Sequence, residues 1–301
     1  MSGAIHLKQA SIYVVIPSMN GEIDNLVKEL CWQTCVPDQI KVVKGVSPNG
    51  RARNIGVQSI LSRIRNEEKN SSYLVFIDDD AYPGSDKLIE SLIFPLMDDD
   101  SIGITGTARV LPKEASWFQR RVAAEIPRTV NDIPQTPIVT NPPLHKYGHS
   151  LITTTCCAMR SAVYEEVGGF REDLTSGVDT DFFYRVRKAG YRLVMVPKVF
   201  VTHPAPCSFS ELVRKFHWYG IGYAQETMRR PEQHLGPLLL TQFHRAAFLF
   251  AATLWLVPNI FILYSFGYPK FSVGFRPLKA VSTYAVAWGY TEGWRRQVVQ
   301  S

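Results

Sequence analysis

The sequence has few cysteines, and their arrangement excludes two kinds of protein. Its 301 residues contain five of them, an odd number with no metal-type spacing: Cys31, Cys35, Cys156, Cys157 and Cys207. This usage excludes a disulfide-stapled fold and indicates a reducing compartment. Cys31 and Cys35 are four residues apart and would share one face of a helix. We favour two small buried residues over a redox or metal pair there.

A long apolar run at the start of the chain is also missing. The first such run, residues 12–16, is too short for the core of a secretory signal. The composition, 46% hydrophobic and 20% charged, excludes disordered and collagen-like chains. At this length we expect one large α/β domain, or one domain with an appendage.

Residues 1–206 have no excess of charge of either sign. They hold 23 Lys and Arg against 23 Asp and Glu, whereas residues 207–301 hold 10 against 4. A balanced first part disfavours a nucleic-acid-binding protein. The basic, aromatic tail fits a membrane surface or an anionic partner.

The first hundred residues alternate between strand and helix patterns. Three β-branched or apolar runs predict strands at 12–16, 40–43 and 73–77. Between them, apolar residues at helical spacing predict helices at 22–34 and 54–64. This alternation predicts βαβ units with a parallel sheet. Ligands bind at the carboxyl ends of such strands, where Ser18, Lys44 and Asp78 follow.

The rest of the first 206 residues is less regular. Residues 102–110 form a further predicted strand, 181–188 a helix, and 191–201 contain a final strand. Residues 112–147 contain six prolines, which predicts a long loop, either a functional lid or a disordered segment.

Three consecutive aspartates, Asp78 to Asp80, follow the apolar run YLVFI. Like charges this close repel unless a cation intervenes. In an extended chain Asp78 and Asp80 project to the same side, as ligands of Mg²⁺ or Mn²⁺ would. The alternative is a solvated acidic turn. Residues 98–100, a second acidic triplet after a helical pattern, are expected to form such an exposed loop.

Five segments in order resemble the family 2 glycosyltransferases with the GT-A fold, a Rossmann-like mixed sheet flanked by helices. They are VVIPSMN, GRARNIG, YLVFIDDD, GGFRE and SGVDTDFFYRVRKAGYRL. The similarity covers residues 13–203, about two thirds of the chain. It implies an inverting enzyme with a DXD-type metal motif.

The resemblance also implies roles for single residues. It places a divalent metal, Mn²⁺ or Mg²⁺, on Asp80, Asp78 and His203. The residues that it places beside the nucleotide sugar are Pro17, Ser18, Asn20, Arg51, Arg53, Asn54, Asp78 and Asp79. Arg51 and Arg53 carry charge suited to a diphosphate. Alternatively, they are helix-start arginines on a solvated face, and His203 is a structural histidine before Pro204.

By the same resemblance, Asp179 is the catalytic base that takes a proton from the acceptor hydroxyl. Its position also suits an N-cap or first-turn acid, which is the structural alternative. Asp181 is expected to orient its neighbours in the same turn.

Three departures from the family pattern affect specificity. Lys44 stands where many relatives have acidic residues that read a uracil or thymine base, and lysine cannot accept the imino hydrogen of that base. Val178 replaces the usual glutamate before the base. The Gln-x-x-Arg-Trp motif of processive synthases is missing from the corresponding region, residues 214–219, so transfer of one sugar per encounter is expected.

The C-terminal region, residues 207–301, is predicted to be helical and membrane-associated. Residues 246–264 carry no charge and are long enough to cross a bilayer, although Pro258 and Asn259 interrupt them. A hairpin, a re-entrant segment and an interfacial helix all remain possible. The alternative is a helix that covers the catalytic domain, residues 1–206, or forms a dimer interface.

Together these features predict a metal-dependent, inverting glycosyltransferase that uses a nucleotide-diphosphate sugar and a hydroxyl acceptor. We expect a lipid-linked or cell-surface glycan as acceptor, in polysaccharide biosynthesis. The location would be cytoplasmic, at the inner face of the membrane through residues 240–290. An inactive, scaffolding relative is the alternative. A nucleotidyltransferase would be expected to show a glycine-rich loop after the first strand, and PSMNGE is not one.

Overall fold

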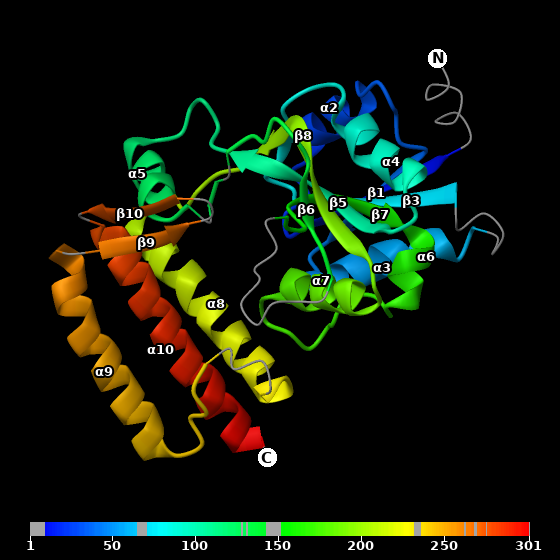
Figure 1. Cartoon of the computed structure of the whole chain (residues 1–301). Coiled ribbons are helices and arrows are strands. Elements are labelled where there is room, and N and C mark those ends of the chain that lie inside the picture. Colours follow the sequence, from blue (N-terminus) through cyan, green and yellow to red (C-terminus); the bar gives the residue numbers. More distant parts are fainter. Residues whose placement is uncertain are drawn as a thin grey trace. The chain divides into compact units, whose positions relative to one another are not determined.

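A computed structural model describes the chain at 10–64, 71–127, 129–130, 132–142, 152–231, 236–261, 263–267, 270–274 and 276–300. It forms two compact units (Figure 1). The first lies within 1–110, 132–173 and 178–203, and the second within 111–131, 174–177 and 204–301. The unit boundary after residue 203 lies close to the predicted one after residue 206. Two short segments expected in the catalytic domain belong to the second unit.

The described part of the first unit is built on an eight-stranded mixed sheet in the order β2-β1-β3-β7-β5-β8-β4, with β6 paired to β8. The strands are β1 (Ser11–Ser18), β2 (Gln39–Lys44), β3 (Ser72–Ile77), β4 (Tyr82–Pro83), β5 (Ile102–Val110), β6 (Ile138–Thr140), β7 (Cys156–Arg160) and β8 (Arg192–Thr202). β1 is parallel to β2 and β3, as predicted, and β5 is parallel to β8. β7 runs antiparallel between β3 and β5.

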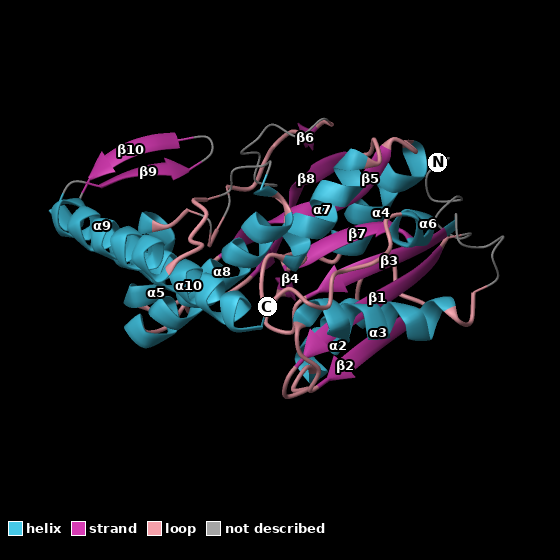
Figure 2. Ribbon diagram, turned by 90° about the horizontal axis from the view of Figure 1, so that it is seen from below, coloured by secondary structure: helices cyan, strands magenta, loops and turns pink. Residues whose placement is uncertain are grey.

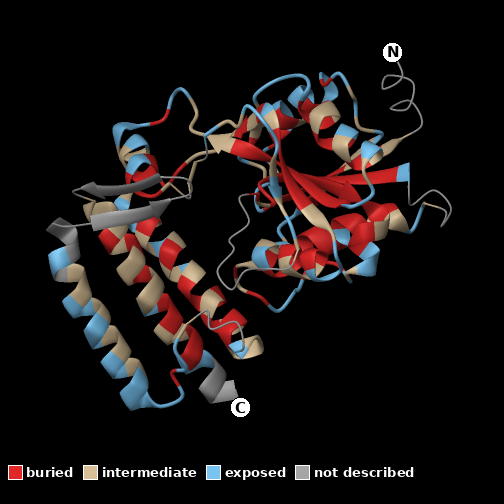
Figure 3. Cartoon of the chain, viewed as in Figure 1, coloured by how far each residue is buried: buried red, intermediate tan, exposed pale blue. Residues whose placement is uncertain are grey.

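Helices cover both faces of this sheet (Figure 2). The helices α2 (Asp24–Cys31) and α4 (Leu88–Asp98) pack on one face, and α3 (Asn49–Leu61), α6 (Ser161–Glu166) and α7 (Val178–Lys188) on the other. The side chains of β1 alternate accordingly: Val14 and Ile16 belong to the first core and Val15 to the second. Each sheet face therefore has its own buried apolar layer (Figure 3).

Two local predictions differ from the structure. Residues 112–147 are not a continuous loop, because they contain α5 (Trp117–Glu125) as well as β6. A capping box begins α5: the Ser116 hydroxyl accepts from the Gln119 backbone, and the Gln119 side chain accepts from the Ser116 backbone. Cys31, expected to be buried, is exposed at the end of α2. His145 and His149, which no motif supports, lie outside the described residues.

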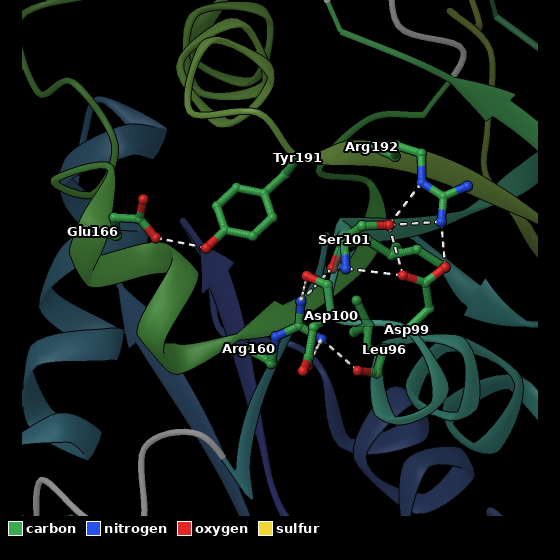
Figure 4. A network of polar contacts seen from close by, with 9 residues as sticks. Leu96, Asp99, Asp100, Ser101, Arg160, Glu166, Tyr191 and Arg192 are labelled. Atoms are coloured by element: carbon green, nitrogen blue, oxygen red, sulfur yellow. Dashed lines mark hydrogen bonds and ion pairs between the residues drawn. The ribbon is translucent and has the colours of Figure 1, made fainter.

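The second acidic triplet begins with the last residue of α4 and continues into a turn, in which Asp100 is exposed and Asp99 is partly buried (Figure 4). The Asp99 carboxylate accepts hydrogen bonds from the Ser101 hydroxyl and backbone and from Arg192, and the Ser101 bonds are the main cause of its lowered pKa. The guanidinium of buried Arg160 donates to the backbone oxygens of Leu96, Asp100 and Ile102. This network joins the end of α4 to β5, β7 and β8.

The second unit consists mainly of helices. Besides α5 it contains α8 (Phe209–Arg229), α9 (Gln242–Phe261), α10 (Pro277–Gln300) and the antiparallel hairpin β9 (Leu263–Gly267) and β10 (Lys270–Gly274). The α10 helix packs against both α8 and α9 (Figure 1). Glycines allow the close approach to α8: a Cβ atom on Gly220 would lie 2.1 Å from the Val286 carbonyl oxygen.

The apolar helix of the tail differs from its prediction in one respect. Pro258 and Asn259 lie within α9, which continues to Phe261, so they do not interrupt the helix. In the described part of the chain, none of the helices has the length and hydropathy needed to cross a bilayer.

Candidate active site

The carboxyl ends of the parallel strands β1 and β2 lie side by side, and a tight turn follows β1. The backbone NH of Gly45 donates to the Ser18 carbonyl (2.9 Å), and that of Gly21 donates to the Ser18 hydroxyl (2.8 Å). Pro17 and Ser18 are buried, whereas Asn20 is exposed. The Lys44 side chain lies against Gly21, where any Cβ atom would collide with it. Lys44 therefore covers the turn in which the predicted donor residues lie.

The aspartate triplet follows β3 and leads directly into β4. Tyr82 of β4 pairs with Thr202, the last residue of β8. His203, which follows Thr202, therefore lies beside the triplet. The imidazole Nε2 of His203 is 3.4 Å from Oδ1 of Asp80, and its backbone NH donates to Val110 (2.9 Å). Strand pairing thus brings together residues 123 positions apart in the sequence.

Asp78, Asp80 and His203 form a group whose candidate ligand atoms all lie within 4.8 Å of one another. These are the three residues that the sequence analysis proposed as metal ligands. Two carboxylates and an imidazole suit a divalent ion such as Mn²⁺ or Mg²⁺. The Asp80 side chain is 51% exposed and leaves room for further ligands from solvent or substrate. The residues present therefore fit the implied metal.

Arg53 and Arg51 have different environments. The Arg53 side chain is 2% exposed, and its Nη2 atom lies 2.7 Å from Oδ1 of Asp78. Its guanidinium also lies over the Phe170 ring, 5.7 Å from the centroid. The guanidinium of Arg53 is thus buried and holds Asp78, and its predicted contact with the donor stays a prediction. Arg51, in the first turn of α3, is exposed.

Asn54, another predicted donor residue, has its amide fully engaged inside the protein. It donates to the Phe170 carbonyl (2.8 Å) and to Glu172 (2.9 Å). Its oxygen accepts from the Tyr164 hydroxyl (2.6 Å) and from the Phe170 backbone (2.9 Å). A side-chain amide can make four hydrogen bonds, so donor contact would require one of these to break. The Gly-Gly-Phe segment indicates a turn in the sequence, but nothing in the sequence shows that Asn54 binds it.

Asp179 and Asp181 lie in the first turn of α7 with different exposure. Asp179 is partly exposed and accepts from the Thr180 backbone (3.0 Å). Asp181 is 2% exposed and pairs with Arg185 (2.9 Å) and Arg171 (3.4 Å). Asp181 therefore orients its neighbours, as expected, and Asp179 is the more exposed of the two carboxylates.

The two acidic positions share an electrostatic neighbour, the Cys157 thiol of β7. Burial is the main cause of its strongly raised pKa, and the charges of Asp78 and Asp179 raise the pKa further. The Arg53 charge acts in the opposite direction. Of the triplet and of α7, it is Asp78 and Asp179 whose charges act on this buried thiol.

Comparison with known proteins shows the family and the fold of the chain. The profile of the glycosyltransferase-like family 2 matches residues 4–220. The chain belongs to this family. Two curated relatives are the pre-mycofactocin glycosyltransferases of two Mycobacterium tuberculosis strains, each 29% identical over 92 residues. That match covers 31% of this chain and only 19% of each relative.

The chain also shares its fold with a solved structure. A mannosyltransferase from Pyrobaculum calidifontis, in complex with GDP-Man and Mn²⁺, is 14% identical with a TM-score of 0.51. The alignment covers 95% of this chain and 87% of the mannosyltransferase. The chain thus has the GT-A fold as well as the family's sequence pattern.

Proposed function

We propose that this glycosyltransferase transfers a sugar from a nucleotide-diphosphate donor in a metal-dependent, inverting reaction. The group of Asp78, Asp80 and His203 carries the proposal, because its ligand atoms lie close enough to share one ion. Mn²⁺ is favoured by the imidazole in the set, and by the Mn²⁺ named in the complex of the similar mannosyltransferase.

In this proposal Asp179 is the general base. Its partly exposed carboxylate accepts the proton of an acceptor hydroxyl as that oxygen attacks the anomeric carbon. The bond from the anomeric carbon to the diphosphate oxygen breaks in the same step, and the electron pair leaves with the diphosphate. A single displacement from the opposite side inverts the anomeric centre. A divalent ion held at the triplet would supply compensation for the charge gained by the diphosphate.

The donor is proposed to lie along the carboxyl ends of β1 and β2. Arg51 and Asn20 are exposed there and can meet phosphate or ribose oxygens, whereas Pro17 and Ser18 shape the turn beneath. Asp79, partly exposed between the two metal-binding aspartates, would face the ribose or the sugar. Lys44 disfavours a base that needs an imino acceptor.

The proposed acceptor is a lipid-linked or cell-surface glycan at the inner face of the cell membrane. The basic, apolar character of residues 207–301 supports this location. One sugar per encounter is expected, because the synthase motif is missing from residues 214–219.

Thermal-shift and donor-hydrolysis assays with a panel of nucleotide sugars test the proposal. A true donor should raise the melting temperature with Mn²⁺ present, since a ligand that binds the folded state stabilises it. Asp80→Ala should abolish both the shift and hydrolysis. Asp98→Ala, which removes an exposed carboxylate at the end of α4, is the matched control and should change neither. Donor binding indifferent to Mn²⁺ and to Asp80→Ala would refute the mechanism.

A further inference from the structure

Over the residues of α9 whose burial is described, the helix packs against the protein along one face. The Phe248 ring lies 5.7 Å from that of Tyr290 on α10, next to a buried cluster that includes Leu239 and Trp294. Side chains at 245, 248, 249, 252, 255 and 256 are partly buried, which is the spacing of a single helix face. This face contacts α10.

The opposite face of α9 is apolar and exposed (Figure 3). Phe243 is 78% exposed, Phe250 65% and Leu254 60%, and their spacing of seven and four residues places them in one row. Alanines at 246, 247 and 251 are exposed beside them. No residue from 246 to 258 carries a charge.

A helix that is apolar on all sides is normally buried on all sides. A row of exposed phenylalanine and leucine side chains, continued by Leu238 (50%) and Leu240 (58%) before the helix, marks an interaction surface. The occupant of this surface must be apolar where it meets α9. It must also be compatible with the net positive charge of residues 207–301.

We infer that the outward face of α9 lies in the interfacial layer of an anionic lipid membrane. Residues 207–301 hold 10 basic and 4 acidic residues, which complements anionic headgroups. Two of those acids are already paired inside the region, Glu226 with Arg230 and Glu292 with Arg295. A second copy of the chain would bring the same positive excess and be repelled.

This inference rests on the proposed membrane location and names the surface responsible. The 20 residues of α9 extend about 30 Å. The helix would lie in the plane of the membrane, with Phe243, Phe250 and Leu254 inserted roughly 5–10 Å and the other face held by α10.

Vesicle co-sedimentation of the full chain tests the surface. The double variant Phe250→Asp and Leu254→Asp places two charges on the exposed row without altering the face that packs on α10. Val36→Asp, at an apolar residue of the first unit that is 55% exposed, is the matched control.

The wild-type chain and the control should bind phosphatidylcholine vesicles containing phosphatidylglycerol, and added salt should weaken that binding. The double variant should bind at least about tenfold more weakly, since two buried side chains of this size are lost from the lipid. Equal binding by the variant and the wild type, or none by the wild type, would overturn the inference. A wild-type dimer in light scattering that the variant dissociates, without vesicle binding, would also overturn it in favour of a second copy.

Activity measurements separate this inference from the proposed reaction. The double variant should keep Mn²⁺-dependent donor hydrolysis in the absence of lipid, and Asp80→Ala should keep vesicle binding. If Asp80→Ala loses hydrolysis but still binds vesicles, the membrane inference stands. If Asp80→Ala also loses vesicle binding, the membrane inference is contradicted.

Discussion

Arg51 and Arg53 lie two positions apart on α3, and burial separates their roles. The Arg53 guanidinium neutralises Asp78 inside the protein, so one oxygen of that aspartate is held while the carboxylate remains in the metal group. Arg51 is exposed, and in the proposed function it would meet a donor phosphate. A charged residue predicted to bind substrate can therefore be a structural partner of another site residue.

Substituting the two arginines should separate these roles. Arg53→Met should lower the free energy of unfolding by about 2 kcal/mol, because the partly buried Asp78 loses its charged partner. Arg51→Met should leave stability within about 0.5 kcal/mol of wild type and raise KM for the donor. Denaturant unfolding and donor kinetics measure both. Equal effects of the two variants on stability would contradict the assignment.

Replacing Asp179 tests the base at the same scale. Asp179→Asn keeps the size of the side chain but cannot accept the proton, so kcat should fall about 10²–10⁴-fold. The metal-dependent thermal shift with donor should persist, because the ligand group is elsewhere. Asp181→Asn, at the buried neighbour, should instead lower stability. Unchanged kcat in Asp179→Asn would exclude the residue as base.

At the scale of elements, α3 is joined to the turn before α7 by one side chain. The Asn54 amide makes four hydrogen bonds to Tyr164, Phe170 and Glu172, which are distant from Asn54 in the sequence. Close contact also needs Gly50, where a Cβ atom would lie 2.3 Å from the Arg171 carbonyl oxygen. These contacts fix the chain that leads to Asp179.

Asn54→Ala should lower the free energy of unfolding by about 3 kcal/mol, since its buried partners lose their hydrogen bonds. Gln58→Ala, at an exposed position one turn later on α3, is the control and should change stability by less than about 0.5 kcal/mol. Thermal and urea unfolding measure the difference. A similar small effect for both would show that the network contributes little.

At the scale of the whole molecule, the described chain has two units with separate apolar cores. The candidate active site lies in the first. In the second, the buried Glu125 carboxylate accepts from the backbone NH groups of Leu278 (2.6 Å) and Lys279 (3.2 Å), at the start of α10. This arrangement satisfies backbone donors at a helix N-terminus and complements its dipole.

Glu125→Ala should therefore destabilise the second unit by about 2 kcal/mol. The stabilisation given by Mn²⁺ and donor should remain, because no ligand of the proposed metal lies there. Thermal unfolding with and without Mn²⁺ and nucleotide sugar tests this. Loss of the ligand-induced shift in a folded Glu125→Ala protein would contradict it.

The sequence by itself determined the fold class and most of the strands and helices, and it predicted the residues of the candidate site. Buried apolar runs such as YLVFI, followed by aspartates, are local signals that need no long-range information. It also identified the metal candidates Asp78, Asp80 and His203, through a family pattern. The tertiary structure decided which charges are buried and what they contact. Arg53 and Asn54 carry the same local signals as donor-binding residues, yet their partners come from distant segments that only folding brings together. The tertiary structure also showed which apolar face of α9 is exposed. The periodicity of the sequence could not show this, because neither face of that helix is polar.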